Sequence, residues 1–98
     1  MAETKPSVSA VIPAYFEEKT IASVVERCLP FVDEVLVVND GSTNDTSINA
    51  RNAGARVIEN PRNMGVLKTI RRGLREAKGD IIVTLDADGQ HDPTEIPI

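Results

Sequence analysis

Aromatic residues are scarce in this 98-residue sequence, and the positive charges are outnumbered. The aromatic side chains are Tyr15, Phe16 and Phe31, too few for the interleaved stacking surface that binders of single-stranded nucleic acid use. The formal net charge is −4, from 15 acidic and 11 basic residues, so no overall positive field attracts polyanions. We therefore expect no nucleic-acid partner.

Cysteines and long apolar runs are scarce too. The single cysteine, Cys28, cannot form an intrachain disulfide, and its place in an apolar helical pattern predicts a buried, reduced thiol. Apolar runs such as 35–38 are far shorter than the roughly 20 residues that cross a bilayer, and Met1 to Ser7 has no secretory character. We expect a cytoplasmic protein, or one at the cytoplasmic face of a membrane if a longer parent chain carries an anchor.

Strand-like and helix-like segments alternate along the chain. Short β-branched or apolar segments at 8–12, 34–38, 56–59 and 81–85 predict strands. Helices are predicted by apolar residues spaced three and four apart at Ile21, Val24, Val25, Cys28 and Leu29, by caps at 44–46, and by Leu67, Ile70 and Leu74. The order β-α-β-α-β-α-β predicts an α/β, Rossmann-like fold with a mostly parallel sheet. The length fits one domain over residues 1–98.

Polar clusters follow three of the predicted strands. In open α/β sheets, ligands bind at the carboxyl ends of the strands. The segments after Ile12, Val38 and Leu85 should therefore lie along one edge and form a ligand site.

Asp86 and Asp88 follow the last predicted strand and stand two positions apart. In an extended backbone both side chains point to the same side, so they can share one cation. Carboxylate oxygens suit Mg²⁺ or Mn²⁺, which would neutralise charge on a leaving diphosphate. The alternative is a solvated acidic turn.

Other candidate residues also leave two interpretations open. Asp40 can accept a hydrogen bond from a nucleobase or cap the following turn. Tyr15 can offer an aromatic face to a base or pack at the sheet edge. His91 is a candidate metal ligand or acid/base group, or a packed turn residue. The basic side chains of Arg62, Lys68, Arg71, Arg72 and Arg75 either approach phosphates or form a solvated face.

Several motifs are absent. The sequence contains no Gly-x-Gly-x-x-Gly after the first strand, no Gly-x-x-x-x-Gly-Lys-Ser/Thr, no Gly-x-Ser-x-Gly and no Cys/His metal spacing. Dinucleotide enzymes, P-loop NTPases, hydrolases of the nucleophile-elbow type and zinc modules are therefore disfavoured.

Three blocks of sequence, taken together, resemble the family-2 glycosyltransferases. They are 11–18, 37–43 and 79–88, and they occur in that family's order and spacing. The continuation 89–93 is most similar to the branch related to dolichyl-phosphate mannose synthase, which transfers a sugar from a nucleotide donor to a polyprenyl phosphate. The resemblance covers residues 8–98 and implies the nucleotide-binding half of a GT-A fold.

The resemblance also implies roles for individual residues. The donor nucleotide would be bound by Pro13, Ala14, Tyr15, Glu17, Asp40, Asp86 and Ala87. The metal, Mg²⁺ or Mn²⁺, would be held by Asp86, Asp88 and Gln90. The implied donor is a UDP- or GDP-linked sugar, and a polyprenyl phosphate is the implied acceptor. No catalytic base is assigned, because family members carry it in a later part of the chain.

Three departures from the family pattern stand out. Phe16 occupies a position where Asn is common, Asn39 replaces a frequent Asp, and 66–68 replaces a small, basic stretch, which puts phosphate contacts from Lys68 in doubt. Family members are also longer. The alternative function is therefore a non-catalytic nucleotide-binding or self-associating module, with a homo-oligomer forming through an exposed sheet edge.

Overall fold

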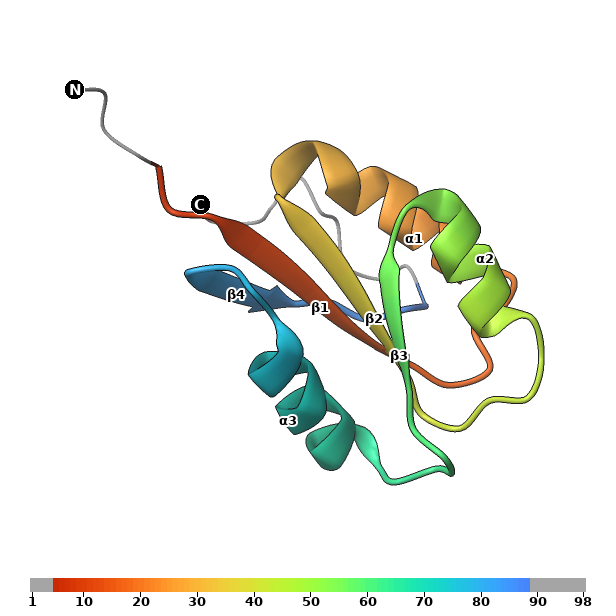
Figure 1. The fold of residues 1–98 in the computed structure, drawn as a ribbon. Helices are drawn as coiled ribbons and strands as arrows, with labels where there is room; N and C mark the ends of the chain where they lie inside the picture. The colour runs from red at the N-terminus through yellow and green to blue at the C-terminus, as the bar shows by residue number, and fades with distance from the viewer. Residues whose placement is uncertain (1–4, 89–98) are drawn as a thin grey trace.

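The computed structural model describes residues 5–88 (Figure 1). Its elements are β1 (Val8–Ala14), α1 (Ile21–Cys28), the 3₁₀ helix η1 (Leu29–Phe31), β2 (Glu34–Asn39), α2 (Thr46–Ala53), β3 (Arg56–Glu59), α3 (Val66–Glu76) and β4 (Ile81–Thr84). The predicted alternation of strands and helices is confirmed.

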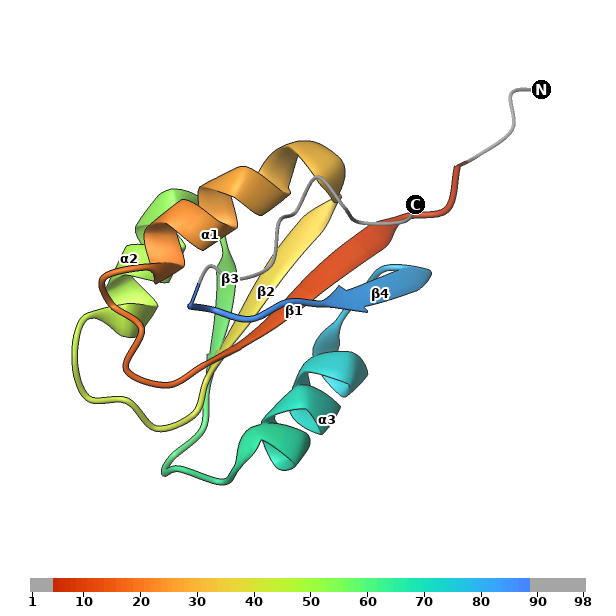
Figure 2. The same ribbon diagram turned by 180° about the vertical axis from the view of Figure 1, so that it is seen from behind.

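The four strands form one sheet in the order β3-β2-β1-β4, and every pairing is parallel. Helices α1 and α2 cover one face, and α3 covers the other (Figures 1 and 2). After β3 the chain therefore crosses to the other face of the sheet as α3. It then joins the sheet again as β4, which pairs with β1 on the side opposite to β2. This arrangement confirms the predicted α/β fold.

Strand β1 runs through Pro13 to Ala14, two residues beyond the predicted end. The pairing of β1 with β4 ends at Val11, opposite Thr84, while the pairing with β2 continues to Ala14. A proline lacks the N–H that a ladder on both sides requires. Pro13 fits here because it has a strand neighbour on one side only.

The main core lies between the sheet and the α1/α2 layer. Ile21, Val24, Val25 and Cys28 of α1 are buried, as predicted. Burial raises the pKa of the Cys28 thiol, which keeps it protonated. Leu29 differs from the prediction: the helix ends at Cys28, so Leu29 enters η1 and is partly exposed.

Helix α3 is present as predicted, but its leucines do not form its buried face, and Ile70 is only half-buried. Leu67 is 72% exposed and Leu74 is 43% exposed, whereas Thr69 and Gly73 are buried. A Cβ at Gly73 would overlap the side chain of Val11. The small residue therefore lets α3 lie directly against β1.

Two features of the described part bear on location and assembly. Among residues 5–88, no helix is long and apolar enough to cross a membrane. Strands β3 and β4 form the two edges of the sheet. Self-association through an edge stays a prediction.

Candidate functional site

A pocket of about 380 Å³ lies at the carboxyl ends of the strands. Its lining residues are Pro13, Ala14, Tyr15, Glu17, Asp40, Asn63, Gly65, Val66, Thr69, Asp86, Ala87 and Asp88. All the predicted donor and metal residues within 5–88 are in this group. Gln90 and His91 lie outside the described residues.

The three strand ends are joined directly to one another. The Asp40 amide donates to the carbonyl of Ala14 at 2.8 Å, and the Leu85 amide donates to the carbonyl of Val11 at 3.2 Å. Parallel pairing thus brings together three segments that are far apart in the sequence. The segments after Ile12, Val38 and Leu85 thus lie together along one edge of the sheet, as predicted.

Asp86 and Asp88 flank a buried residue. Ala87 is 4% exposed and belongs to the core, while both aspartates are exposed and line the pocket. The hydroxyl of Thr20 donates to the Ala87 carbonyl at 2.7 Å. This bond fixes the turn against the start of α1, with both carboxylates on the pocket side.

The segment after β1 forms another wall of the pocket. The ring centroids of Tyr15 and Phe16 are 4.7 Å apart in an edge-to-face arrangement, and both rings are about half exposed. The Glu17 amide donates to the Thr46 hydroxyl at 3.1 Å, and the Glu17 carboxylate accepts from Thr20 at 3.3 Å. These contacts tie the wall to the starts of both α1 and α2.

Phe16 has a φ of 53°, the only positive φ of a non-glycine residue among those described. Asn tolerates this left-handed conformation far better than Phe does. The backbone geometry thus gives a physical reason why Asn is common at this position in the family that the sequence resembles.

Asp40 is 5% exposed and organises the loop after β3. One carboxylate oxygen accepts from the Met64 amide at 2.7 Å and from Asn60 Nδ2 at 2.9 Å. The other accepts from the Gly65 amide at 3.0 Å and from Asn63 Nδ2 at 3.1 Å. These four donors fill the roughly four acceptor positions of a carboxylate.

The charge of Asp40 is stabilised by this cage. Burial alone would raise the pKa of its carboxyl group, but the donors from Asn60, Met64 and Gly65 hold that pKa below its usual value. A nucleobase N–H can reach Asp40 only by sharing or displacing one of these donors. The base-binding role of Asp40 stays a prediction.

Gly41 lets the loop come close to β2. Its φ is +87°, and a Cβ at this position would lie 2.5 Å from the backbone carbon of Arg62 and 2.5 Å from the nitrogen of Asn63. A side chain here would push the 60–65 loop away from Asp40.

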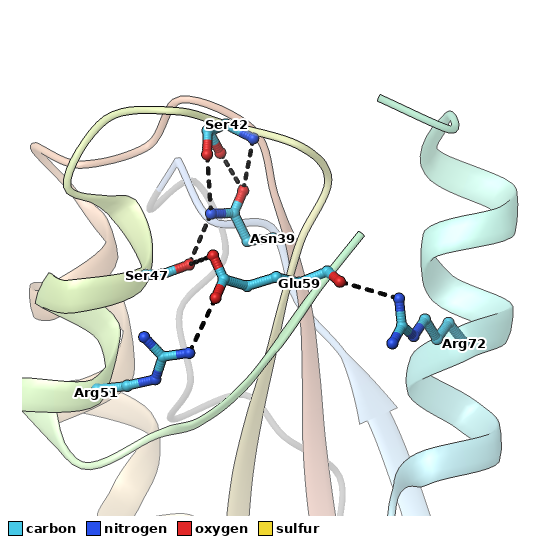
Figure 3. Close-up of polar contacts among 6 residues, drawn as sticks. All are labelled: Asn39, Ser42, Ser47, Arg51, Glu59 and Arg72. Carbon is cyan, nitrogen blue, oxygen red and sulfur yellow. Dashed lines mark hydrogen bonds and ion pairs between the residues drawn. The ribbon is translucent and has the colours of Figure 1, made fainter. Parts of the chain in front are cut away.

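Asn39, the second departure from the family pattern, is buried at the end of β2 (Figure 3). Its Nδ2 donates to the Ser47 hydroxyl at 2.7 Å, and its Oδ1 accepts from the Ser42 amide at 3.0 Å. Ser47 in turn donates to Glu59 at 3.2 Å. An ionised Asp could not donate to Ser47, so the amide suits this network.

Four further residues of the pocket wall were not predicted: Asn63, Gly65, Val66 and Thr69. Thr69 is fully buried, accepts from Asn60 Nδ2 at 3.1 Å and donates to the Gly65 carbonyl at 2.8 Å. In the sequence, the segment Asn60-Pro61-Arg62-Asn63 is typical of a loop. It does not indicate a part of the site, because its partner Asp40 is distant in the sequence.

The basic residues of α3 do not line this pocket. Lys68, Arg71, Arg72 and Arg75 line a second groove with Asn60, Pro61 and Met64. Lys68 therefore lies outside the donor pocket, as the departure of residues 66–68 from the family pattern suggests.

Comparisons with known proteins place these features in a family. The model of glycosyl transferase family 2 matches residues 9–98. A dodecaprenyl-phosphate galacturonate synthase from Rhizobium johnstonii is 35% identical over 92% of this chain and 30% of its own length. A glucosyl-3-phosphoglycerate synthase from Mycolicibacterium paratuberculosis is 41% identical over 84% of this chain and 28% of its own length. The chain thus spans about 30% of the length of these relatives.

A solved structure shows the same fold. Glucosyl-3-phosphoglycerate synthase from Mycobacterium tuberculosis, crystallised with Mn²⁺, UDP-glucose and phosphoglyceric acid, matches with a TM-score of 0.75 and 36% identity, over 84% of this chain and 33% of that chain. The same enzyme was also crystallised with Mg²⁺ and UDP. The expected GT-A architecture is confirmed. The family model covers almost all of the sequence and the fold agrees with it, so the chain belongs to glycosyl transferase family 2.

Proposed function

We propose that this chain forms the donor-binding part of a metal-dependent glycosyltransferase that uses a UDP-linked sugar. The observation that carries the proposal is the single pocket into which Tyr15, Asp40, Asp86 and Asp88 converge from three strand ends. The M. tuberculosis relative with UDP-glucose and Mn²⁺ supports it, and makes UDP a better candidate than GDP.

The donor nucleotide is proposed to lie between two walls of the pocket. Pro13, Ala14, Tyr15 and Glu17 form one wall, and the Asp40-bound loop forms another. Asp40 holds four donors, so we propose that a base N–H takes the place of the Asn63 amide, the only side chain among those donors that also lines the pocket. Asn63 would then be free to bond the base or the ribose.

The donor set of the Asp86–Asp88 turn fits a hard divalent cation. Asp86 and Asp88 are exposed residues with carboxylate side chains, and both line the pocket. Residues 5–88 contain no group of three acidic, histidine or cysteine side chains that could hold a metal alone. Two carboxylates completed by substrate phosphates are a common arrangement for Mg²⁺. Gln90 is proposed as a further ligand.

When bound, the cation would stabilise negative charge on the leaving diphosphate. The residues of this chain hold and orient the donor: Thr20 fixes the turn through Ala87, and Tyr15 shields the nucleotide from water. No described pocket residue is proposed as the catalytic base.

A polyprenyl phosphate is the proposed acceptor. The name of the R. johnstonii relative refers to a dodecaprenyl phosphate. An undecaprenyl-phosphate 4-deoxy-4-formamido-L-arabinose transferase from Edwardsiella ictaluri is 36% identical over 92% of this chain and 31% of its own length. We also propose that the chain belongs to the branch of the family that is related to dolichyl-phosphate mannose synthase. Cytoplasmic localisation likewise stays a prediction.

Calorimetry with UDP and GDP, with and without Mn²⁺ or Mg²⁺, tests the donor site. We expect UDP to bind only with metal, and Asp88→Asn to weaken that binding by about tenfold or more. Glu26→Gln is the matched control, since Glu26 is an exposed carboxylate on α1 outside the pocket. Metal-independent binding, or equal binding by the Asp88→Asn and Glu26→Gln variants, would contradict the proposal.

A further inference from the structure

The outer side of α3 carries a cationic stripe. Lys68, Arg71, Arg72 and Arg75 are spaced three and four residues apart, so they lie next to one another on the helix surface. With Asn60, Pro61 and Met64 they line a groove of about 460 Å³. We call these four residues the α3 cationic stripe.

The stripe has no acidic partner in the described part of the chain. The ion pairs within residues 5–88 are Arg51–Glu59 and Arg56–Glu34, and neither includes a side chain of α3. Like charges at these spacings destabilise a helix. The concentration of positive charge contrasts with the net charge of −4 and calls for an anionic partner.

One member of the stripe is held in place, and the others are exposed. Arg72 NH1 donates to the carbonyl of Glu59 at 3.1 Å (Figure 3). It also donates to Asn60 Oδ1 at 2.9 Å. Its guanidinium is thereby fixed at the end of β3. Lys68, Arg71 and Arg75 are exposed and free to follow the shape of a charged surface.

Large apolar side chains lie beside the stripe. Leu67 is 72% exposed, Val66 60%, Leu74 43% and Met64 36%. Leu67 and Leu74 are seven residues apart and therefore share one side of the helix. Exposed apolar side chains next to Lys and Arg on one helix are the pattern of segments that lie in the interface of an anionic membrane.

We propose that α3 docks on the surface of an anionic lipid bilayer, with the stripe on the headgroups and Leu67 and Leu74 inserted between them. A short amphipathic segment needs both positive charge and apolar side chains to bind a membrane. The charge attracts it to the surface, and the buried apolar area retains it there. A small dissolved anion would use the charges but not the leucines. The observations therefore favour a membrane.

The position of α3 gives this docking a consequence for the site. Val66, the first residue of α3, also lines the donor pocket. A bilayer along α3 thus lies beside the pocket, within reach of a phosphate that is carried on a lipid. The access of a lipid-carried phosphate to the pocket rests on the proposed function, whereas the docking of α3 on the bilayer does not.

Flotation of the chain with lipid vesicles tests the proposal. We expect binding to phosphatidylcholine vesicles that contain phosphatidylglycerol, no binding to pure phosphatidylcholine, and loss of binding at high salt. Arg71→Gln with Arg75→Gln should lower the partition coefficient about 25-fold, since each cation near an anionic surface contributes about fivefold. Lys5→Gln with Lys19→Gln makes the same change in net charge away from α3 and should leave binding unchanged.

Leu67→Gln tests the apolar half of the surface. It should weaken flotation while leaving the salt dependence intact. Circular dichroism checks that each variant is folded. UDP binding without vesicles should be the same in all of these variants, so loss of donor binding and loss of docking are separate results.

Three outcomes would overturn the docking. The first is equal binding to neutral and anionic vesicles, and the second is equal loss in the α3 and control variants. The third is the absence of flotation with anionic vesicles. Saturable binding of inorganic phosphate would then assign the groove to a small anion, and a dimer in light scattering would assign it to a second copy of the chain.

Discussion

The two faces of the sheet are closed in different ways. On one face, α1 contributes Ile21, Val24, Val25 and Cys28 to a continuous apolar core. On the other face, which α3 covers (Figure 2), the helix buries a threonine and a glycine and leaves Leu67 and Leu74 exposed. On the first face, both the helix and the sheet therefore supply large apolar side chains. On the second, the sheet supplies them and the small residues of α3 allow a close backbone approach.

The buried clusters show the same difference. The core under α1 and α2 continues into Leu85 and Ala87, next to the predicted metal turn. Under α3, the buried cluster consists of Val11, Leu36 and Val38. Substitutions on the two faces should thus differ in size and in kind.

The largest effect is expected from Ile21→Ala in α1. Ile21 is fully buried, so the substitution should lower the free energy of unfolding by about 2–5 kcal/mol. The matched change in α3, Leu67→Ala, should cost less than about 0.5 kcal/mol because Leu67 is mostly exposed. Urea unfolding followed by circular dichroism measures both. Equal losses would show that Leu67 is covered in solution.

Asp40→Asn comes next, since it removes the charge that holds the 60–65 loop. The new amide would present N–H groups to donors, so we expect a loss of about 2–3 kcal/mol. UDP binding should also weaken, because Asn63 and Gly65 line the pocket. Asp33→Asn is a control that keeps the net charge equal and changes a carboxylate at the opposite end of the sheet, where it accepts from the Val8 amide. Unchanged UDP binding by Asp40→Asn would contradict the role of the loop.

The same carboxylate predicts a pH dependence. The pKa of Asp40 is lower in the folded chain than its usual value, so its contribution is complete above the unfolded pKa of about 3.9 and is lost as pH falls through the folded pKa. Glu34 has a lowered pKa too, because the Lys78 amide, Ser9 and Arg56 outweigh burial. Unfolding free energies between pH 6 and pH 2 should fall less steeply in Asp40→Asn than in the wild type.

Gly73→Ala should have a smaller effect, from two opposing terms. The added methyl would overlap Val11, and overpacking costs about 1–3 kcal/mol. Alanine offsets about 1 kcal/mol of this through its helix propensity. We expect a net loss of about 1 kcal/mol in urea unfolding. A loss in the double variant Gly73→Ala with Val11→Ala that is smaller than the sum of the two single losses would confirm that the two side chains compete for one space.

Phe16→Asn should have the smallest effect. It relieves a left-handed backbone at a bulky residue, worth about 1–2 kcal/mol, but it loses the ring contact with Tyr15, worth about 0.5–1.5 kcal/mol. The expected result is a gain of less than about 1 kcal/mol in thermal unfolding. Phe16→Leu, which loses the ring contact and keeps the strain, should be less stable than the wild type.

Much of the fold could be predicted because each element carries a local pattern. Ile21, Val24, Val25 and Cys28 repeat at helical spacing, and β-branched runs mark the strands. The end of β1 was missed because proline usually stops a strand. The buried face of α3 was missed because leucines normally mark such a face, whereas here Thr69 and Gly73 occupy it.

Most residues of the site could be predicted for a related reason. Asp40, Asp86 and Tyr15 follow strands, and the carboxyl ends of parallel strands meet at one edge. The loop from Asn60 to Gly65 could not be predicted as part of the site. Its place depends on hydrogen bonds to Asp40, more than 20 positions away in the case of Met64.

The sequence by itself determined the order of the elements, the parallel sheet and the strand ends at which the polar residues gather, since these follow from periodicity and chain direction. Only the tertiary structure decided that the Asp40 carboxylate is already surrounded by four donors, that the 60–65 loop closes the pocket, and that the leucines and cations of α3 face outward. Those outcomes depend on which side chains meet across long sequence separations, and no local pattern contains that information.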